Sequence, residues 1–263
     1  MLTKGIKASL ATALVLCATT GIASADVMYS QGFETDTSGW SSGGDYGNVE
    51  RVASGTNGVD AFEGDWYGVL TQSESGPYTF FDGAQDMFTP WSAQTAIYLD
   101  TSWALGEGFD YSVASNGSDG NHQRDFIFHV TQDTSTGDLM VGGSNNTNFE
   151  PREDLENLNS IVVENSGWYV FEHVFRNDGG TLAVDLNLWD ALGNLLFTET
   201  RNNAADTIPG EVGGNSYGWF TNIDIAGGIN IDSTMLSREV TEPSTLAIFA
   251  LSLLGAARLR RKA

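Results

Sequence analysis

The chain is short of cysteine and of basic residues, and each shortage excludes a class of protein. One cysteine among 263 residues cannot form a disulfide within the chain, so the protein is not a disulfide scaffold. Twelve basic against 34 acidic residues give a formal net charge of -22, which repels phosphate, so we expect no nucleic-acid partner. Hydrophobic residues still make up 41% of the chain, enough to form a core, so the chain is not disordered.

The few basic residues concentrate at the two ends of the chain. Lys4 and Lys7 lie near the start, and four basic residues lie between Arg258 and Lys262. The stretch 26–242 between them holds all 34 carboxylates, six arginines and no lysine. Such an anionic body stays hydrated and self-repelling, and it suits a neutral glycan or a calcium-bridged matrix better than an acidic polysaccharide. A saline habitat would explain the same charge equally well.

The first 25 residues have the three regions of a secretory signal peptide. These are a charged start with Lys4 and Lys7, an apolar stretch over 8–18, and a small-x-small cleavage site at Ala23-Ser24-Ala25. We therefore predict cleavage by signal peptidase after Ala25, in preference to a buried N-terminal helix. The lone Cys17 would be removed with this segment, which leaves an exported body without a thiol.

Residues 238–263 form a second apolar, basic-ended segment. Its apolar run covers 246–257 and is followed by Arg258-Leu259-Arg260-Arg261-Lys262. Twelve helical residues reach only about 18 Å, but counting from Pro243 to Leu259 brings the segment near the lower limit for a membrane span. The terminal cations favour the cytoplasmic side, so we expect a short transmembrane helix with the large domain outside.

This tail resembles the PEP-CTERM sorting signal of Gram-negative bacteria. Glu242 and Pro243 match the last two positions of the Pro-Glu-Pro signature, Ser244 follows as it commonly does, and Arg258, Arg260 and Arg261 supply the basic end. Thr241 stands in place of the first proline. The resemblance implies recognition by an exosortase in the inner membrane, cleavage near the signature, and delivery to the cell surface or to an extracellular polysaccharide matrix.

The body between the two ends has the pattern of an all-β domain. Stretches 168–176, 182–189 and 195–200 alternate between apolar and polar residues, and Gly- and Asn-rich connectors join them. This predicts an antiparallel meander with one buried side. Further strands are predicted at 27–33, 49–53, 67–70, 78–81, 95–99, 109–114, 126–132, 139–142, 161–164, 217–223 and 229–235, with one short helix at 152–158. We therefore expect one β-sandwich domain over 26–237.

The borders and the meander of this body resemble known extracellular folds. The opening Tyr29-Ser30-Gln31-Gly32-Phe33-Glu34 and the closing Ile229-Asn230-Ile231-Asp232 are similar to the paired first and last strands of jelly-roll domains. The meander with its Gly-Trp-Tyr entry resembles concanavalin A-like lectin and glucanase domains. These resemblances imply an antiparallel jelly-roll β-sandwich of the concanavalin A-like or carbohydrate-binding-module type, with adjacent termini.

An enzymatic interpretation has weak support. Glycoside hydrolysis needs two carboxylates about 5 to 9.5 Å apart, which 34 acidic residues can satisfy by chance. The resemblance to glucanases implies Glu-x-Asp-x-x-Glu on one strand, and Glu63-Gly64-Asp65 begins this pattern, but Gly68 stands where the third acid belongs. The three histidines have no metal-ligand spacing, and no Gly-x-Ser-x-Gly motif occurs.

Calcium is the most plausible ion, because it binds carboxylate and carbonyl oxygens and stabilises many extracellular β-domains. The jelly-roll resemblance implies ligands where the terminal strands meet, at Glu34, Asp36 and Asp232. A second candidate is Asp133 with Asp138 in the Asp-Thr-Ser-Thr-Gly-Asp turn. The alternative in each case is a set of solvated acidic turn residues.

Aromatic residues outside the clearest strands are candidates for stacking on sugars. Trp66, Tyr67, Trp91 and Trp103 lie near glycine or loop sequence and could form an exposed platform, whereas core packing is the alternative. We expect a secreted protein without catalysis that binds glycans or belongs to an exopolysaccharide matrix. The alternatives are a polysaccharide hydrolase or lyase on a concanavalin A-like fold, and a purely structural surface protein.

Overall fold

A computed structural model of the chain describes residues 24–81, 88, 90–146, 152–209 and 217–240. The expected signal-peptide helix, the residue Ala23 of its cleavage site, and the expected membrane helix with the sorting residues 242–261 lie outside the described residues. Residues 25–239 form one compact unit. Within the described ranges, no helix is both long enough and apolar enough to cross a membrane.

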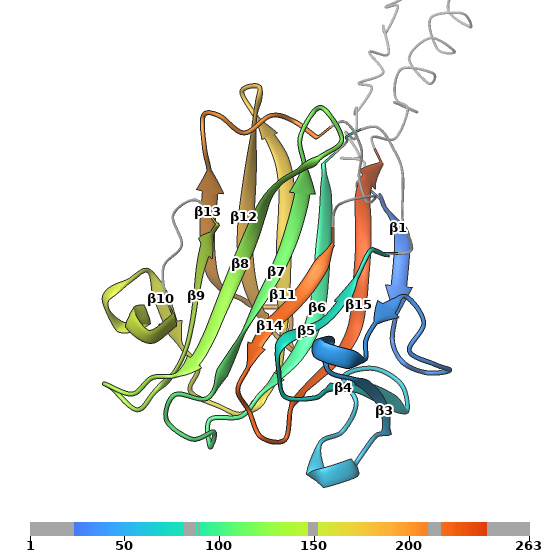
Figure 1. The fold of residues 1–263 in the computed structure, drawn as a ribbon, viewed down its shortest axis with the longest axis vertical. Helices are drawn as coiled ribbons and strands as arrows, with labels where there is room; N and C mark the ends of the chain where they lie inside the picture. The colour runs from blue at the N-terminus through green and yellow to red at the C-terminus, as the bar shows by residue number, and fades with distance from the viewer. Residues whose placement is uncertain (1–23, 82–87, 89, 147–151, 210–216, 241–263) are drawn as a thin grey trace, which may run out of the picture. The chain divides into compact units, whose positions relative to one another are not determined.

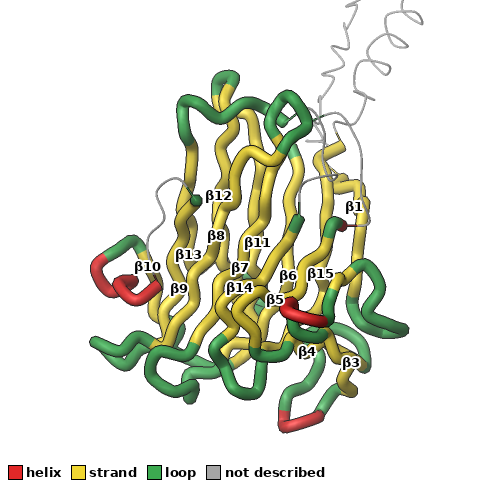
Figure 2. The backbone as a smooth tube through the Cα atoms, viewed as in Figure 1, coloured by secondary structure: helices red, strands yellow, loops and turns green. Residues whose placement is uncertain are grey.

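Two β-sheets are stacked face to face (Figure 1). Sheet A runs in spatial order β13 (Leu195–Asn202), β12 (Thr181–Asp190), β11 (Gly167–Asp178), β6 (Trp91–Leu99), β15 (Ile229–Val240), β4 (Trp66–Leu70) and β3 (Val49–Ala53), and β1 (Ser24–Gln31) also pairs with β15. Sheet B runs β10 (Ser160–Val162), β9 (Leu139–Asn145), β8 (His122–Gln132), β7 (Gly108–Asn116), β14 (Gly218–Ile223), β5 (Ser73–Thr79) and β2 (Trp40–Ser41). The described helices are short 3-10 segments: η1 (Gly44–Tyr46), η2 (Thr56–Gly58) and η4 (Arg152–Asn157) (Figure 2).

The expected meander is confirmed. Strands β11, β12 and β13 pair in sequence as antiparallel neighbours. Gly179, Gly180 and Gly193 in the connectors have positive φ angles of 64°, 104° and 80°, which glycine adopts without steric cost. In β12 the apolar residues Leu182, Val184, Leu186 and Leu188 are buried, as their alternation predicts.

The core lies between the two sheets and is rich in aromatic residues. It is formed mainly by alternate residues of the long strands, including Phe109, Tyr111, Val113, Phe126, Phe128, Phe171, Phe175 and Phe220. Burying a side chain of this size contributes roughly 1.5–3 kcal/mol to folding. The all-β sandwich expected from the sequence is therefore present.

The first and last strands of the domain meet, as the jelly-roll resemblance implies. Strand β1 pairs with β15 in sheet A, and Asp26 of β1 forms an ion pair with Arg238 of β15 at 3.1 Å. The chain therefore enters and leaves this domain along neighbouring strands.

Candidate functional site on the outer face of sheet B

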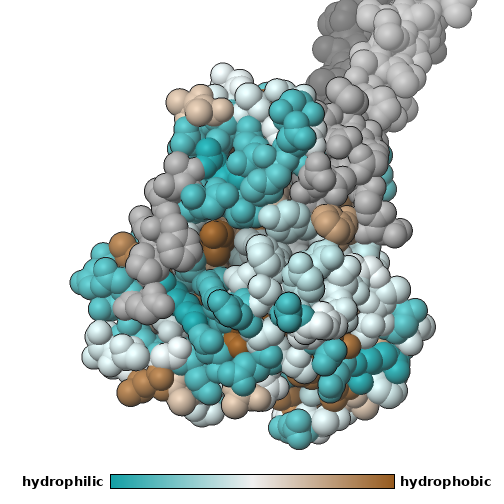
Figure 3. All heavy atoms as spheres, in the orientation of Figure 1, coloured by the Kyte–Doolittle hydropathy of each residue, from teal (hydrophilic) through white to brown (hydrophobic). Residues whose placement is uncertain are grey.

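The outer face of sheet B carries aromatic and polar residues that come from strands far apart in the sequence. Strand alternation turns Phe126 and Phe128 inward and leaves the residues between them on the outer face. The ladder places Ser112 opposite both Trp219 of β14 and Ile127 of β8, and Ile127 opposite Ser144 of β9. Figure 3 shows pale surface over β5, β14 and η1 beside a hydrophilic area over β8 and β9.

Five aromatic residues from η1, β5, β14 and the residues next to these strands form a continuous row, the aromatic strip. The members are Tyr46, Tyr78, Phe80, Tyr217 and Trp219. Tyr46 and Phe80 each lie 5.3 Å from Tyr78 between ring centroids, and Phe80 lies 6.2 Å from Tyr217. Neighbouring rings meet edge to face, so the strip is ridged rather than flat. Tyr46 and Phe80 are 43% and 42% exposed, which leaves these two rings free to contact a ligand.

A polar group centred on Asp125 adjoins one end of the strip. The hydroxyl of Tyr217 donates to Asp125 Oδ1 at 2.9 Å, and Asn146 Nδ2 donates to Asp125 Oδ2 at 3.1 Å. His122 Nε2 lies 3.3 Å from the same carboxylate, and its ring stacks parallel to that of Tyr217. Burial and the nearby carboxylate raise the pKa of Tyr217, so its hydroxyl remains a hydrogen-bond donor at neutral pH.

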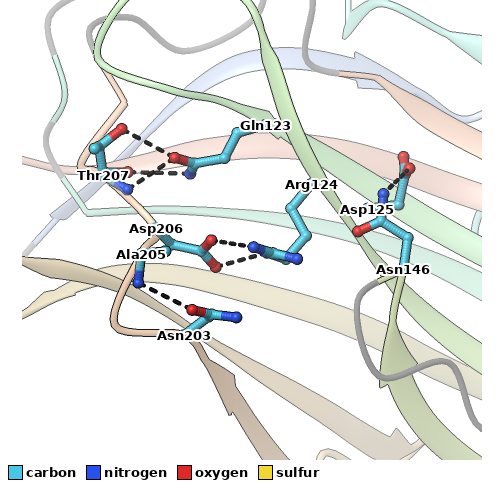
Figure 4. Close-up of polar contacts among 8 residues, drawn as sticks. All are labelled: Gln123, Arg124, Asp125, Asn146, Asn203, Ala205, Asp206 and Thr207. Atoms are coloured by element: carbon cyan, nitrogen blue, oxygen red, sulfur yellow. Dashed lines mark hydrogen bonds and ion pairs between the residues drawn. The ribbon is translucent and has the colours of Figure 1, made fainter.

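The end of β8 that carries Asp125 is fixed to the segment after β13. Figure 4 shows Arg124 turned toward Asp206 and Asp125 turned away toward Asn146. Arg124 Nε donates to Asp206 Oδ2 at 2.7 Å, and its second guanidinium nitrogen contacts the other oxygen. Asp206 is 2% exposed, so this bidentate pair joins the two sheets out of solvent.

The outer face also holds a buried row of three residues from β7, β8 and β9. His129 Nδ1 lies 2.7 Å from Asp110 Oδ1, and His129 Nε2 lies 2.7 Å from Ser144 Oγ. Asn222 Nδ2 donates to the second oxygen of Asp110 at 2.7 Å. The order of groups is that of a catalytic triad, but a nucleophile must reach its substrate, and Ser144 and His129 are both 0% exposed. The arrangement shown is a buried hydrogen-bond relay.

The residues that sequence analysis assigns to a platform do not gather on one surface. Trp91 and Tyr67 are 2% and 1% exposed, so this interpretation is wrong for both. Trp91 stacks on Phe175 in the core, because β6 is a central strand with one side facing the sandwich interior. Trp66 is half-buried, and the guanidinium carbon of Arg51 lies 3.5 Å from its ring centroid, which covers one face. Trp103 is half-buried and packs edge-on against Phe109 of the core.

The three carboxylates expected to bind calcium have different surroundings. Asp232 is 0% exposed, and its oxygens accept the backbone N–H groups of Glu63 at 3.1 Å and Ser233 at 2.7 Å. Glu34 Oε1 accepts the backbone N–H groups of Asp65 and Trp66, each at 3.0 Å. The Glu34 charge lies near enough to influence Asp232. The terminal-strand corner thus brings these two acids together.

Asp36 instead forms hydrogen bonds with residues close to it in the sequence. Its Oδ1 accepts the Ser38 N–H at 2.9 Å and faces Gln31 Nε2 at 3.4 Å. These hydrogen bonds, chiefly those from Ser38, lower the pKa of Asp36. Because Glu34 and Asp232 already receive N–H donors that aim hydrogens at their oxygens, this corner is a poor fit for a cation, and a calcium site there stays a prediction.

Burial raises the pKa of Asp232 to about 6, and the Glu34 charge adds to this effect. The N–H groups of Glu63, Ser233 and Phe62 act in the opposite direction but do not outweigh burial. Asp232 therefore changes its charge state within a physiologically accessible pH range.

The remaining chemical motifs of the sequence are separated in the fold. His122 and His129 lie on the outer face of sheet B, whereas His173 lies in the core, where burial lowers its pKa to about 3 and keeps it neutral. Glu63-Gly64-Asp65 lies in the loop before β4, so its acids do not alternate along a strand as in the glucanase pattern. Among the described residues, no three His, Cys, Asp or Glu side chains gather closely enough to hold a metal.

Comparison with known proteins supports the sorting interpretation of the tail. Residues 239–262 match the model of the PEP-CTERM protein-sorting motif, which confirms the resemblance seen in Glu242 and Pro243. The chain is thus an all-β sandwich protein with a PEP-CTERM sorting motif, and the motif indicates export to the surface. A search of curated proteins finds no match.

The chain is similar to several solved structures at low sequence identity. The CBM2 module of the Lactobacillus casei BL23 phage J-1 evolved Dit is 12% identical, with a TM-score of 0.47 over 82% of this chain and 97% of that one. The exoplasmic/lumenal domain of VIP36 in its Ca2+/Man3GlcNAc-bound form is 12% identical, with a TM-score of 0.47 over 84% and 93%. Peanut lectin with a 9mer peptide is 11% identical, with a TM-score of 0.40 over 81% and 98%.

Proposed function

We propose that this protein is exported to the cell surface or an extracellular matrix, where it binds carbohydrate on the outer face of sheet B without catalysis. The single observation that carries the proposal is the pair of exposed rings, Tyr46 and Phe80, on either side of Tyr78. Aromatic faces stack on the apolar faces of sugar rings, and a few fixed polar groups orient the sugar hydroxyls.

The geometry of the strip favours more than one sugar unit. Tyr46 and Phe80 are each 5.3 Å from Tyr78, and each meets Tyr78 edge to face. Their exposed faces are therefore separate contact points on one ridge, suited to successive units of a chain. Asp125 at the far end, with His122 beside it, supplies a hydrogen-bond acceptor for hydroxyl groups.

The charge of the body restricts the ligand class. With a formal net charge of -22 on the chain, an acidic polysaccharide would be repelled unless divalent cations bridged it. We therefore expect a neutral glycan, or an acidic one only in the presence of calcium. The catalytic alternative is a polysaccharide hydrolase or lyase, and the release of reducing sugar distinguishes it from binding alone.

Delivery to the surface rests on the two ends of the chain. The proposed route is translocation and cleavage by signal peptidase at Ala23-Ser24-Ala25, transient retention in the inner membrane by the tail, and release by an exosortase near Glu242-Pro243. The proposed destination is the outer surface or matrix of a Gram-negative bacterium.

The test is a glycan array followed by titration calorimetry with the purified chain. We expect binding to neutral glycans that Tyr46→Ala and Phe80→Ala each weaken at least tenfold, because each removes one stacking face. Leu192→Ala is the matched control, since Leu192 is 88% exposed in the turn between β12 and β13 of sheet A. Binding that survives the double aromatic substitution would refute this site, and release of reducing sugar by the wild-type protein would refute the non-catalytic role.

A further inference from the structure

The outer face of sheet A carries an apolar row that crosses four strands. The ladder places Leu195 of β13 opposite Trp189 of β12, Trp189 opposite Val170 of β11, and Val170 opposite Ala96 of β6. Trp189 points away from the core, because Leu188 next to it is buried in the sandwich. Leu195 is 50% exposed, Trp189 and Val170 are half-buried, and the small Ala96 is buried. We call these four outward residues the sheet A row.

The same face presents little unpaired negative charge, although the chain has a formal net charge of -22. Away from the ends of β6, β11, β12 and β13, two carboxylates lie on this face, those of Asp185 and Glu172. Arg176 donates to both oxygens of Asp185, at 2.7 and 3.0 Å. Glu172 Oε2 accepts Trp189 Nε1 at 3.0 Å and Asn187 Nδ2 at 3.1 Å. Because acidic bodies repel each other, a face whose carboxylates are held by donors of the chain itself lets two copies approach with little repulsion.

A row of amide and hydroxyl side chains runs beside the sheet A row. The ladder aligns Thr198 of β13 with Asn187 of β12, Asn187 with Glu172 of β11, and Glu172 with Gln94 of β6. Amides and hydroxyls both donate and accept hydrogen bonds, so this row can pair with a copy of itself. In a two-fold interface the same patch meets itself, and self-complementarity is therefore the property that such an interface requires.

The outer face of sheet A is also large enough for a stable interface. The ladder of β11 with β6 extends from Gly167 to Phe175, which is roughly 30 Å at about 3.3 Å per residue. The strands from β13 to β15 lie side by side at about 4.8 Å and together span roughly 24 Å. The product is roughly 700 Å² per copy, close to the value of about 800 Å² per partner for a standard protein–protein interface.

We propose that two copies of this chain associate back to back through the outer face of sheet A, with the sheet A row at the centre of the contact. Trp189 is the anchor, because tryptophan at the desolvated centre of an interface contributes strongly to binding, and Glu172 already fixes its ring. Sheet B covers the inner face of sheet A, so the outer face of sheet B points outward in both copies (Figure 1). One pair would then join two glycan chains, a consequence that rests on the proposed function.

Sedimentation velocity of the full chain tests the proposal over about a hundredfold range of concentration, in a mild detergent that solubilises the apolar run at 246–257. We expect a monomer–dimer equilibrium that tightens as salt rises, because salt screens the repulsion between two anionic bodies. Leu195→Asp places a charge in the contact and Trp189→Ala removes the anchor, so each should weaken association at least tenfold. Tyr46→Ala should leave association unchanged, which separates this proposal from glycan binding.

Leu105→Asp is the matched control, because Leu105 is 62% exposed and the residue after it is hydrogen-bonded to Gln132 of sheet B. It introduces the same charge outside the proposed contact and should keep wild-type association, and circular dichroism verifies that each variant is folded. A wild-type chain that stays monomeric throughout, or variants Leu195→Asp and Trp189→Ala that associate as tightly as the wild type, would overturn the proposal. If the wild type is monomeric and Trp189→Ala loses glycan binding, the face binds sugar and not a second copy.

Discussion

Trp91 of β6 and Phe175 of β11 are stacked face to face between the sheets, with ring centroids 3.7 Å apart and planes within 5°. The two residues are direct neighbours in the antiparallel ladder, and both are almost fully buried. Trp91 therefore contributes packing to the sandwich and offers no surface to a ligand. The same ladder joins β6 to the meander, so this contact holds the centre of sheet A.

Replacing Trp91 with Ala should lower the free energy of unfolding by about 3–5 kcal/mol, because the cavity left in a close-packed core cannot collapse fully. Urea unfolding of the two proteins provides the measurement. Leu192→Ala, at an exposed turn, should change the stability by less than about 0.5 kcal/mol. A loss of stability no larger for Trp91→Ala than for Leu192→Ala would show that the stacked pair is not part of the core.

The raised pKa of Asp232 predicts a dependence of stability on pH. Its pKa is about 6 in the folded chain and 3.8 in the unfolded chain, so between these values the folded state binds more protons. Stability should therefore fall as pH rises from about 4 to above 6, by at most about 3 kcal/mol. Urea midpoints at pH 4.5, 6 and 7.5 measure this slope.

Asp232→Asn should flatten that slope, because no titrating group then remains at this position. Asp36→Asn is the control, since the pKa of Asp36 is lowered and its contribution falls outside this pH range. An unchanged slope in Asp232→Asn would assign the pH dependence to another group.

The buried ion pair between Arg124 and Asp206 predicts a large effect of removing one partner. Arg124→Met leaves Asp206, which is 2% exposed, as an uncompensated buried charge and should cost about 3–5 kcal/mol of stability. Arg176→Met is the comparison, because Arg176 pairs with Asp185 at a solvent-accessible position and should cost no more than about 1 kcal/mol. Denaturant unfolding of both variants measures the two losses of stability. Equal losses would show that the Arg124–Asp206 pair behaves as a solvent-exposed ion pair.

We expect the buried hydrogen-bond relay from Asp110 through His129 to Ser144 to stabilise the fold and to take no part in catalysis. Ser144→Ala leaves His129 Nε2 without the hydroxyl 2.7 Å away and should cost about 1–3 kcal/mol. A fluorophosphonate probe should not label the wild-type protein, because Ser144 is 0% exposed. Labelling that disappears in Ser144→Ala would instead identify Ser144 as an accessible nucleophile and contradict a purely structural role for the relay.

Most strands of the fold follow from alternation, and the exceptions have physical causes. The strand expected at 78–81 is β5, Ser73–Thr79, which has a weak strand signal because it contains Ser75, Gly76 and Pro77 before Tyr78. Pro77 is tolerated because neither neighbouring strand pairs with it: β2 pairs only with Tyr78 and Thr79, and the register with β14 shifts between Trp219 and Thr221. The helix expected at 152–158 is a 3-10 segment, Arg152–Asn157.

The candidate site was much harder to predict than the fold. Tyr78 and Trp219 are neighbours only because β5 pairs with β14, and alternation cannot show which distant strands will pair. The sequence carries one indication of the relay. Asp110, His129 and Ser144 each lie at positions that alternate with the inward-facing residues of their strands. This alternation places the three polar residues on one face of the sheet, but it predicts neither the order of the strands nor their register.

The position of β15 has a mechanical consequence. This final strand is hydrogen-bonded to β6 and β4 and also pairs with β1, and Asp26 and Arg238 add an ion pair across the terminal strands. A force applied at residue 240 would therefore act on the hydrogen bonds of β15 to β6, β4 and β1 at the same time, and not on a single edge strand. A protein held at its C-terminal end in flowing water would resist forced unfolding through the strand nearest its attachment.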